Sequence, residues 1–155
     1  MKDHKCYAYV RNLWLLAFID FFSKSWAVSH FKYPVCFNSF LSFNVVYNYG
    51  ISWSMFASSK TLVFVAITLV SGFFLFYFSW YAYQRRMNGY CTYAETLVIV
   101  GGTANFIDRL YHKAVVDFIQ ISWGSWTFPI FNIADICIVA GVCIMLLQTM
   151  TESES

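Results

Sequence analysis

The chain has 155 residues, of which 59% are hydrophobic and 12% are charged. Soluble domains carry about 25% charged residues, so this composition argues against a soluble globular protein and favours a membrane protein. The formal net charge is only +2 and no basic run is longer than Arg85-Arg86, which argues against a nucleic-acid partner. No Cys/His spacing typical of a metal site is present, so neither a metal nor a cofactor is expected.

Four apolar segments are long enough to cross a bilayer as helices, which takes about 20 residues each. Transmembrane helices are predicted over residues 13–31, 62–83, 93–111 and 132–150. The second of these contains no charged residue. The expected fold is therefore an all-α polytopic membrane protein with four transmembrane helices, in a single domain over residues 1–155.

The two segments on the other side of the membrane from the termini show the period of β-strands. Before the second helix, Phe43, Val45 and Tyr47 occupy alternate positions, and before the fourth helix Asp117 and Ile119 do. This alternation predicts a small β element lying on the outer surface.

Positively charged residues near the helix ends indicate the orientation. Five lie on each side of the predicted helices, so the raw count is a tie. Lys24 and Arg109 fall inside helices beside carboxylates and are better counted as site residues. Without them the count is five against three, which predicts that both termini lie in the cytoplasm.

The polar residues within the predicted helices gather at one depth. The first and third helices run outward and carry their polar groups late, whereas the fourth runs inward and carries them early, so all lie in the outer half of the bilayer. The residues concerned are Asp20, Lys24, Asn105, Asp108, Arg109, Asn132 and Asp135.

Helical spacing predicts particular contacts among these groups. Asp20 and Lys24 are four residues apart and can pair on one helix face, most simply as a structural ion pair. The guanidinium of Arg109 suits either a carboxylate or a lipid phosphate, and a purely structural role together with Asp108 is the alternative. Asn132 follows a proline-containing turn and is expected to cap the fourth helix or to steer the carboxylate three residues later.

Two aspartates suggest a chemical role. A carboxylate near the membrane is costly unless it is paired or functional, and Asp117 and Asp135 are brought to the same face. Two close carboxylates share a proton and can activate water, which suits a hydrolase. A transporter or proton relay and a non-enzymatic membrane scaffold remain open at this point. A relay should extend across the bilayer, whereas these polar groups are confined to one half.

The chain resembles the lipoprotein signal peptidases, also called signal peptidase II, over nearly its whole length. Each shared motif is weak alone, but five of them in the right order between four helices are specific. In order, they are Asp20 with Lys24, Asn48-Tyr49-Gly50, GGTANFIDR at 101–109, VVDF around Asp117 and FNIAD ending at Asp135. The chain departs from the usual pattern at Phe21, where a glutamine commonly stands.

The resemblance implies four transmembrane helices with a small β cradle on the outer face. It implies removal of the signal peptide from a prolipoprotein just before a cysteine that carries a diacylglyceryl group, with Asp117 and Asp135 as the catalytic pair. It implies a substrate site lined or supported by Asn48, Gly50, Asn105, Arg109 and Asn132. The expected location is a bacterial cytoplasmic (inner) membrane with the active site towards its outer face. The expected partners are the lipid-modified substrate and membrane phospholipid, and the protein is expected to be a monomer.

Overall fold

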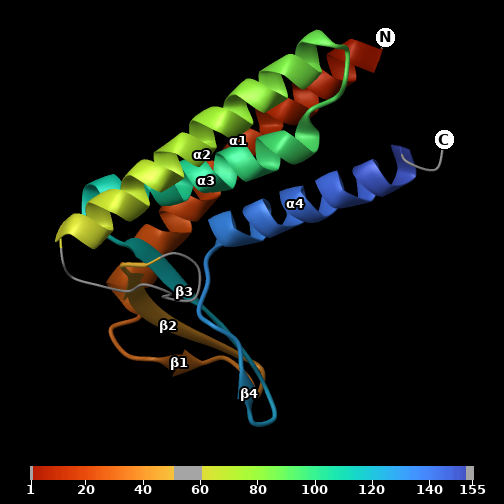
Figure 1. Ribbon diagram of the computed structural model, residues 1–155. Coiled ribbons are helices and arrows are strands. Elements are labelled where there is room, and N and C mark those ends of the chain that lie inside the picture. Colours follow the sequence, from red (N-terminus) through yellow and green to blue (C-terminus); the bar gives the residue numbers. More distant parts are fainter. Residues whose placement is uncertain (1, 51–60, 153–155) are drawn as a thin grey trace.

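The computed structural model describes residues 2–50 and 61–152. Within them, a bundle of helices stands over a small antiparallel sheet (Figure 1). The helices are α1 (Lys2–His30), α2 (Thr61–Met87), α3 (Tyr93–His112) and α4 (Ile133–Glu152). The strands are β1 (Val35–Cys36), β2 (Leu41–Asn48), β3 (Val115–Trp123) and β4 (Trp126–Thr127). The mostly helical fold with a small sheet is the one that the sequence predicts.

The four predicted helices are confirmed as helices; two ends differ by several residues, and the others agree within two residues. α1 begins at Lys2 rather than at residue 13, because the prediction followed the apolar segment and not the charged turns before it. α2 continues past residue 83 to Met87 and ends on Arg85-Arg86. Basic side chains in a last turn are favourable beside the negative end of the helix dipole, which explains the extension.

Two of the described helices are long and apolar enough to cross a membrane: α2 over Leu62–Met87 and α4 over Ile133–Thr151. In the most apolar window of α2 only 6% of the residues are buried within the protein. An apolar helix surface this exposed is costly in water and suits contact with lipid. The charged side chains of α1 and α3, among them Lys24 and Asp108, lower the mean hydropathy of those helices.

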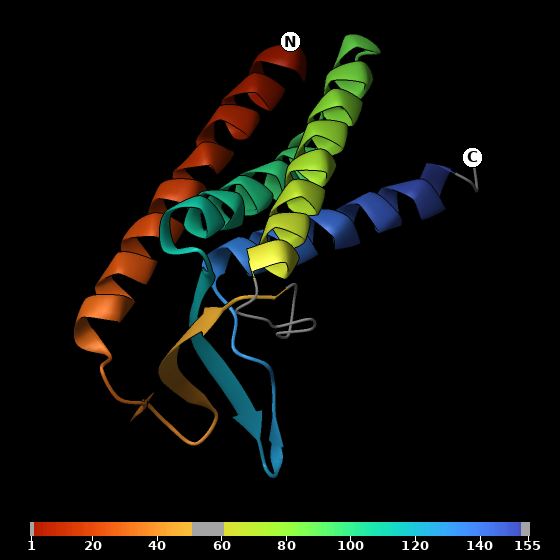
Figure 2. The same ribbon diagram turned by 60° about the vertical axis from the view of Figure 1, so that its left-hand side comes forward.

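The sheet has the order β1-β2-β3-β4, and its central pair confirms the two predicted strands. In the β2–β3 register Val46 is opposite Asp117 and Asn48 is opposite Val115, with a bulge between Phe43 and Val46. A further bridge joins Ile119 to Phe131, so the segment before α4 also lies beside β3 (Figure 2). This pairing brings the start of α4 next to Asp117.

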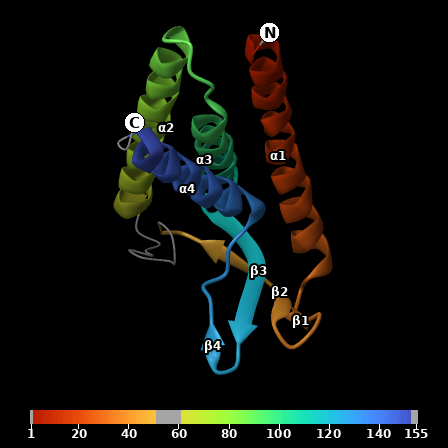
Figure 3. The same ribbon diagram turned by 90° about the vertical axis from the view of Figure 1, so that its right-hand side faces the viewer.

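α3 is the central helix, because it packs against each of the other three (Figure 3). Its contact with α4 is close at two glycines: Gly101 faces the backbone of Ala134, and Gly141 of α4 faces the backbone of Ala94. Gly102 instead faces the side chain of Leu75 in α2. The N-terminal end of α1 and the C-terminal end of α4 lie away from the sheet (Figure 1). The C-terminal end of α3 and the N-terminal end of α4 lie beside it.

Candidate active site

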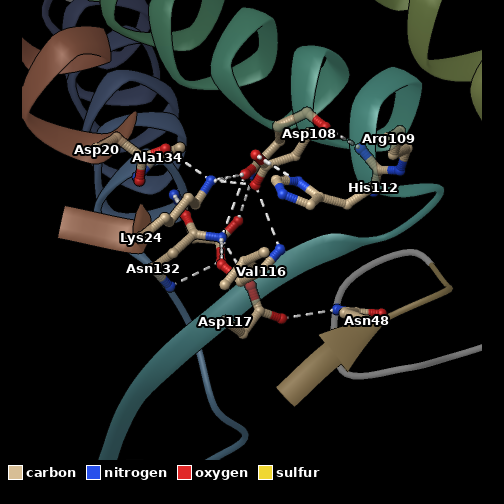
Figure 4. A network of polar contacts seen from close by, with 12 residues as sticks. Asp20, Lys24, Asn48, Asp108, Arg109, His112, Val116, Asp117, Asn132 and Ala134 are labelled. Carbon is tan, nitrogen blue, oxygen red and sulfur yellow. Dashed lines mark hydrogen bonds and ion pairs between the residues drawn. The ribbon is translucent and has the colours of Figure 1, made fainter. Parts of the chain in front are cut away.

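A buried polar cluster lies where α1, α3, β3 and the start of α4 meet (Figure 4). Its centre is the ammonium of Lys24, which lies 2.6 Å from Asp20 Oδ2 and 2.8 Å from Asp108 Oδ2. Lys24 Nζ also donates a hydrogen bond of 2.9 Å to Asn105 Oδ1. An ammonium has three donors, so these contacts satisfy it completely. The pairing of Asp20 with Lys24 follows the predicted spacing, and Asp108 pairs with Lys24 rather than with Arg109.

The same ion cluster fixes the two elements that carry Asp117 and Asp135. Asp108 Oδ2 accepts a hydrogen bond of 3.2 Å from Val116 N, at the start of β3. Asp20 Oδ1 accepts one of 2.8 Å from Ala134 N, in the first turn of α4. Charge-assisted bonds of this kind are stronger than neutral ones, so both backbone segments are firmly held.

The first turn of α4 is closed by a reciprocal cap. Asp135 N donates a hydrogen bond of 2.9 Å to Asn132 Oδ1, and Asn132 N donates one of 3.2 Å to Asp135 Oδ2. This is the arrangement of a capping box, in which the cap residue and the third helical residue satisfy each other's backbone. Asn132 therefore caps the helix, and it also orients the carboxylate of Asp135.

Both aspartates are held by asparagine amides. Asp117 Oδ1 accepts a bond of 2.6 Å from Asn132 Nδ2, and its Oδ2 accepts one of 2.9 Å from Asn48 Nδ2. Asp135 Oδ1 accepts a bond of 2.8 Å from Asn105 Nδ2. Asn132 is thus bonded to both carboxylates, and the two aspartates belong to one hydrogen-bonded unit.

The orientation of the Asn105 amide follows from its neighbours. Lys24 has only donors, so the Asn105 oxygen must face it and the amide nitrogen must face Asp135. Asn132 Nδ2 lies 3.2 Å from the same Asn105 oxygen and donates to it. The two asparagines therefore connect the buried ion cluster with the pair of aspartates.

Asp117 lies in the sheet and is only 3% exposed. Burial, and next the negative charge of Asp135, raise the pKa of Asp117 to about 7. The amides of Asn48 and Asn132 act in the opposite direction, because they stabilise its ionised form. A carboxyl group in this environment can keep a proton near neutral pH while a neighbouring carboxylate accepts one.

Arg109 connects the end of α3 with the segment that follows β2. Its guanidinium donates to Gly50 O at 3.3 Å and to Asn105 O at 3.4 Å. Gly50 N in turn donates a bond of 3.0 Å to Asn48 Oδ1. Within the described residues, these hydrogen bonds of Arg109 go to backbone carbonyls, so its role there is to join Gly50 to α3 beside Asp117.

A cavity of about 850 Å³ opens on the aspartates. Asp117 and Asp135 both line it, and its walls are largely apolar. The polar residues predicted for the site that line it are Asn48, Asn105, Arg109, Asp117 and Asp135. The apolar wall comes chiefly from α2, the segment before α4 and α4 itself, including Phe74, Leu75, Phe78, Pro129, Val139 and Val142.

A family model described as signal peptidase (SPase) II matches residues 13–151, nearly the whole chain. The chain belongs to the signal peptidase II family. The protein is therefore a peptidase, and its exposed apolar helices agree with a membrane location.

Curated relatives and solved structures agree with the family. A lipoprotein signal peptidase of Pasteurella multocida is 34% identical over 144 residues, which are 88% of this chain and 86% of the relative. One of Listeria monocytogenes is 32% identical over 113 residues, or 73% of this chain and 71% of the relative. A structure described as a bacterial membrane enzyme solved by the in meso method at 2.3 Å resolution has a TM-score of 0.71 at 24% identity, covering 97% of this chain and 90% of its own. That last likeness concerns the fold alone.

Several parts of this candidate site in the signal peptidase II chain could not be predicted from the sequence. The backbone groups of Val116 and Ala134, which the ion cluster holds, have no side-chain signal that a sequence pattern could show. The wall supplied by α2 was also missed, because the predicted helix over residues 62–83 has no charged residue to draw attention to it. Among the described residues, no group of three or more His, Cys, Asp or Glu side chains is placed to hold a metal ion.

Proposed function

We propose that this protein removes the signal peptide from diacylglyceryl-modified prolipoproteins, cutting just before the lipidated cysteine. The observation that carries the proposal is the pair of aspartates, Asp117 from β3 and Asp135 from α4, which line one largely apolar cavity. Both accept hydrogen bonds from Asn132, Asp117 from its side-chain amide and Asp135 from its backbone N–H. Family membership supplies the class of substrate, and the pair supplies chemistry for hydrolysis.

In the proposed mechanism the two carboxyl groups hold one proton between them. The ionised member takes a proton from a water molecule as the water oxygen bonds to the scissile carbonyl carbon. The protonated member transfers its proton to the carbonyl oxygen, which becomes a hydroxyl group of the tetrahedral diol intermediate. When the C–N bond breaks, the leaving amine takes the proton that came from the water molecule. One diol hydroxyl then returns its proton to the other carboxylate as the new carboxyl group forms. The pair should be described by two apparent pKa values that belong to it as a unit.

The surrounding residues suit a lipidated peptide. Apolar side chains from α2 and α4 offer a wall for acyl chains or an apolar signal segment. Near the aspartates, the amide of Asn48 and the guanidinium of Arg109 offer donors to a substrate backbone. Gly50 joins these two side chains, because its N–H donates to Asn48 and its carbonyl oxygen accepts from Arg109. Asn105 and Asn132 hold the aspartates in place, whereas Asp20, Lys24 and Asp108 form the structural ion cluster behind them.

We further infer that all four helices cross a bacterial cytoplasmic membrane, as one domain, with both termini in the cytoplasm and the site towards the outer face. Large apolar side chains are exposed on each helix, for example Phe18, Phe73, Leu110 and Leu146, which supports contact with phospholipid. The pair Arg85-Arg86 ends α2 on the side away from the sheet, which supports a cytoplasmic position for that side (Figure 1). The protein is expected to act as a monomer.

The requirement for a lipid is tested with two substrates that differ only in the diacylglyceryl group. The modified prolipoprotein is expected to be cleaved with kcat/KM roughly 100-fold or more above that of its unmodified twin, because contacts with the diacylglyceryl group would hold the scissile bond in place beside the aspartates. Cleavage is measured in lipid or detergent with both substrates inserted in the same way. Equal kcat/KM for the twins would contradict the proposed substrate.

The pH dependence of kcat/KM tests the shared proton. Because the pKa of Asp117 is raised to about 7, most protein molecules have a shared proton on the aspartate pair below that pH and have lost it above that pH. We therefore expect kcat/KM to fall as the pH rises through about 7.

Replacing Asn48 should shift the pH profile in a predictable direction. The amide of Asn48 lowers the pKa of Asp117, so Asn48→Ala should move the alkaline limb of the profile to higher pH. Ser42→Ala, on the same strand and away from the aspartates, should leave the limb in place. A limb that is unmoved, or that moves to lower pH, in Asn48→Ala would show that Asp117 is not the group that titrates.

A further inference from the structure

The peptide units around Ala134 are held from two sides. Ala134 N donates to Asp20 Oδ1 from α1 (Figure 4). The carbonyl oxygen of Ala134 lies against Gly101 of α3. Ala134 directly precedes Asp135 and is 1% exposed. Any displacement of this backbone therefore passes to the Asp135 carboxylate.

The contact at Gly101 leaves no space for a side chain. A Cβ placed there would overlap the carbonyl oxygen of Ala134 and would lie 2.9 Å from Cγ1 of Ile138. The Ile138 side chain can turn away, but the oxygen belongs to the first turn of α4 and cannot. A methyl group at this position must push the start of α4 away from α3. Asp135 would then move away from Asn105, whose amide donates a hydrogen bond of 2.8 Å to Asp135 Oδ1.

We propose that Gly101 is a positioning residue for Asp135: its missing side chain sets the distance between α3 and the first turn of α4. The bond from Ala134 to Asp20 holds the same turn from the other side. The inference rests on the proposed function, because it assigns to Gly101 the placement of one member of the catalytic pair.

Gly141 provides a matched control within the same helix pair. A Cβ there would lie 2.6 Å from the carbonyl oxygen of Ala94 and 2.7 Å from Cγ2 of Val98, so it also meets backbone. It lies farther along α4 than Asp135, towards the C-terminal end of the helix, and that end lies away from the sheet (Figure 1). Substitution at Gly141 should therefore disturb the packing of α3 on α4 without moving the carboxylate.

The experiment compares Gly101→Ala with Gly141→Ala in the full-length protein, by thermal unfolding, kcat, KM and the pH profile. Both variants should lower the unfolding temperature by similar amounts. Gly101→Ala should lower kcat by about 10- to 100-fold, as a misplacement of about 1 Å can, with KM changed less than about threefold. Its alkaline limb should also move. Gly141→Ala should keep kcat within about threefold of the parent and keep the limb in place.

Equal kcat in the two variants, or an unmoved pH profile in Gly101→Ala, would overturn the inference. If Gly101→Ala does not fold, Ile138→Ala is added to remove the side-chain overlap while the carbonyl contact stays, and a normal kcat in that double variant would also overturn it. Asp135→Asn distinguishes a failure of the proposed catalytic pair from a failure of the proposed role of Gly101. Activity in Asp135→Asn refutes the catalytic pair itself, whereas an inactive Asp135→Asn with equal glycine variants refutes only the role of Gly101.

Discussion

Replacing Asp117 or Asp135 by asparagine is expected to lower kcat by roughly 10²- to 10⁴-fold, the usual contribution of a positioned acid or base. Asparagine has nearly the same shape, but it has a single acceptor oxygen, so it keeps only one of the two hydrogen bonds that each aspartate accepts. It cannot take a proton from water, and it cannot return one to the leaving amine. Each single variant is measured for cleavage of the lipid-modified prolipoprotein, with thermal unfolding as the check on folding.

Glu95→Gln is the matched control for this experiment. Glu95 is also a buried carboxylate, on α3 but near its first turn, and its Oε1 lies 2.8 Å from Arg85 Nε. Losing its charge should affect stability and leave kcat near that of the parent protein. Full activity in Asp117→Asn or Asp135→Asn would exclude the proposed pair.

Lys24→Met is expected to destabilise the protein by about 3–5 kcal/mol, the usual effect of removing one partner from a buried ion pair. The methionine fills a similar volume, but Asp20 and Asp108 are left buried without their cation. The anchors of β3 and α4 are weakened with them, so kcat should fall as well. Thermal unfolding in detergent and cleavage are measured on the same preparation.

A double variant shows whether the lost charge balance is the cause. Adding Asp108→Asn to Lys24→Met removes one of the two uncompensated carboxylates, so part of the lost stability should return. The amide of the new asparagine keeps an oxygen that can accept from Val116 N. If Lys24→Met has the same unfolding temperature as the parent protein, the buried ion cluster does not stabilise the fold in the way described.

Much of the fold could be predicted because its signals are local. The four helices follow from apolar segments of sufficient length, and β2 and β3 follow from alternation along a few residues. The cap at Asn132 and the pairing of Asp20 with Lys24 depend on spacings of three and four residues, which a helix converts directly into contact.

The remaining features depend on how the helices are rotated against one another, and no local pattern reports that. The sequence placed Asp108 beside Arg109 as a possible structural pair, but the side chain faces Lys24 of α1 instead. The bond between Asp20 and Ala134 N joins a side chain to a backbone group 114 residues away. The α2 wall of the cavity likewise results from packing on α3, which apolar residues alone do not specify.

The long range of these bonds has a consequence for biosynthesis. Lys24 and Asn105 are 81 residues apart, and Asp20 and Ala134 are 114 residues apart, so the cluster closes only when the last helix has joined the first and third. Contacts between distant parts of a chain form late, because the loops between them must close first. A chain still emerging from the ribosome has Asp117 but not yet Asp135 in place. Under the proposed mechanism, hydrolytic capacity therefore arises only in the stage of assembly at which α4 joins α1 and α3.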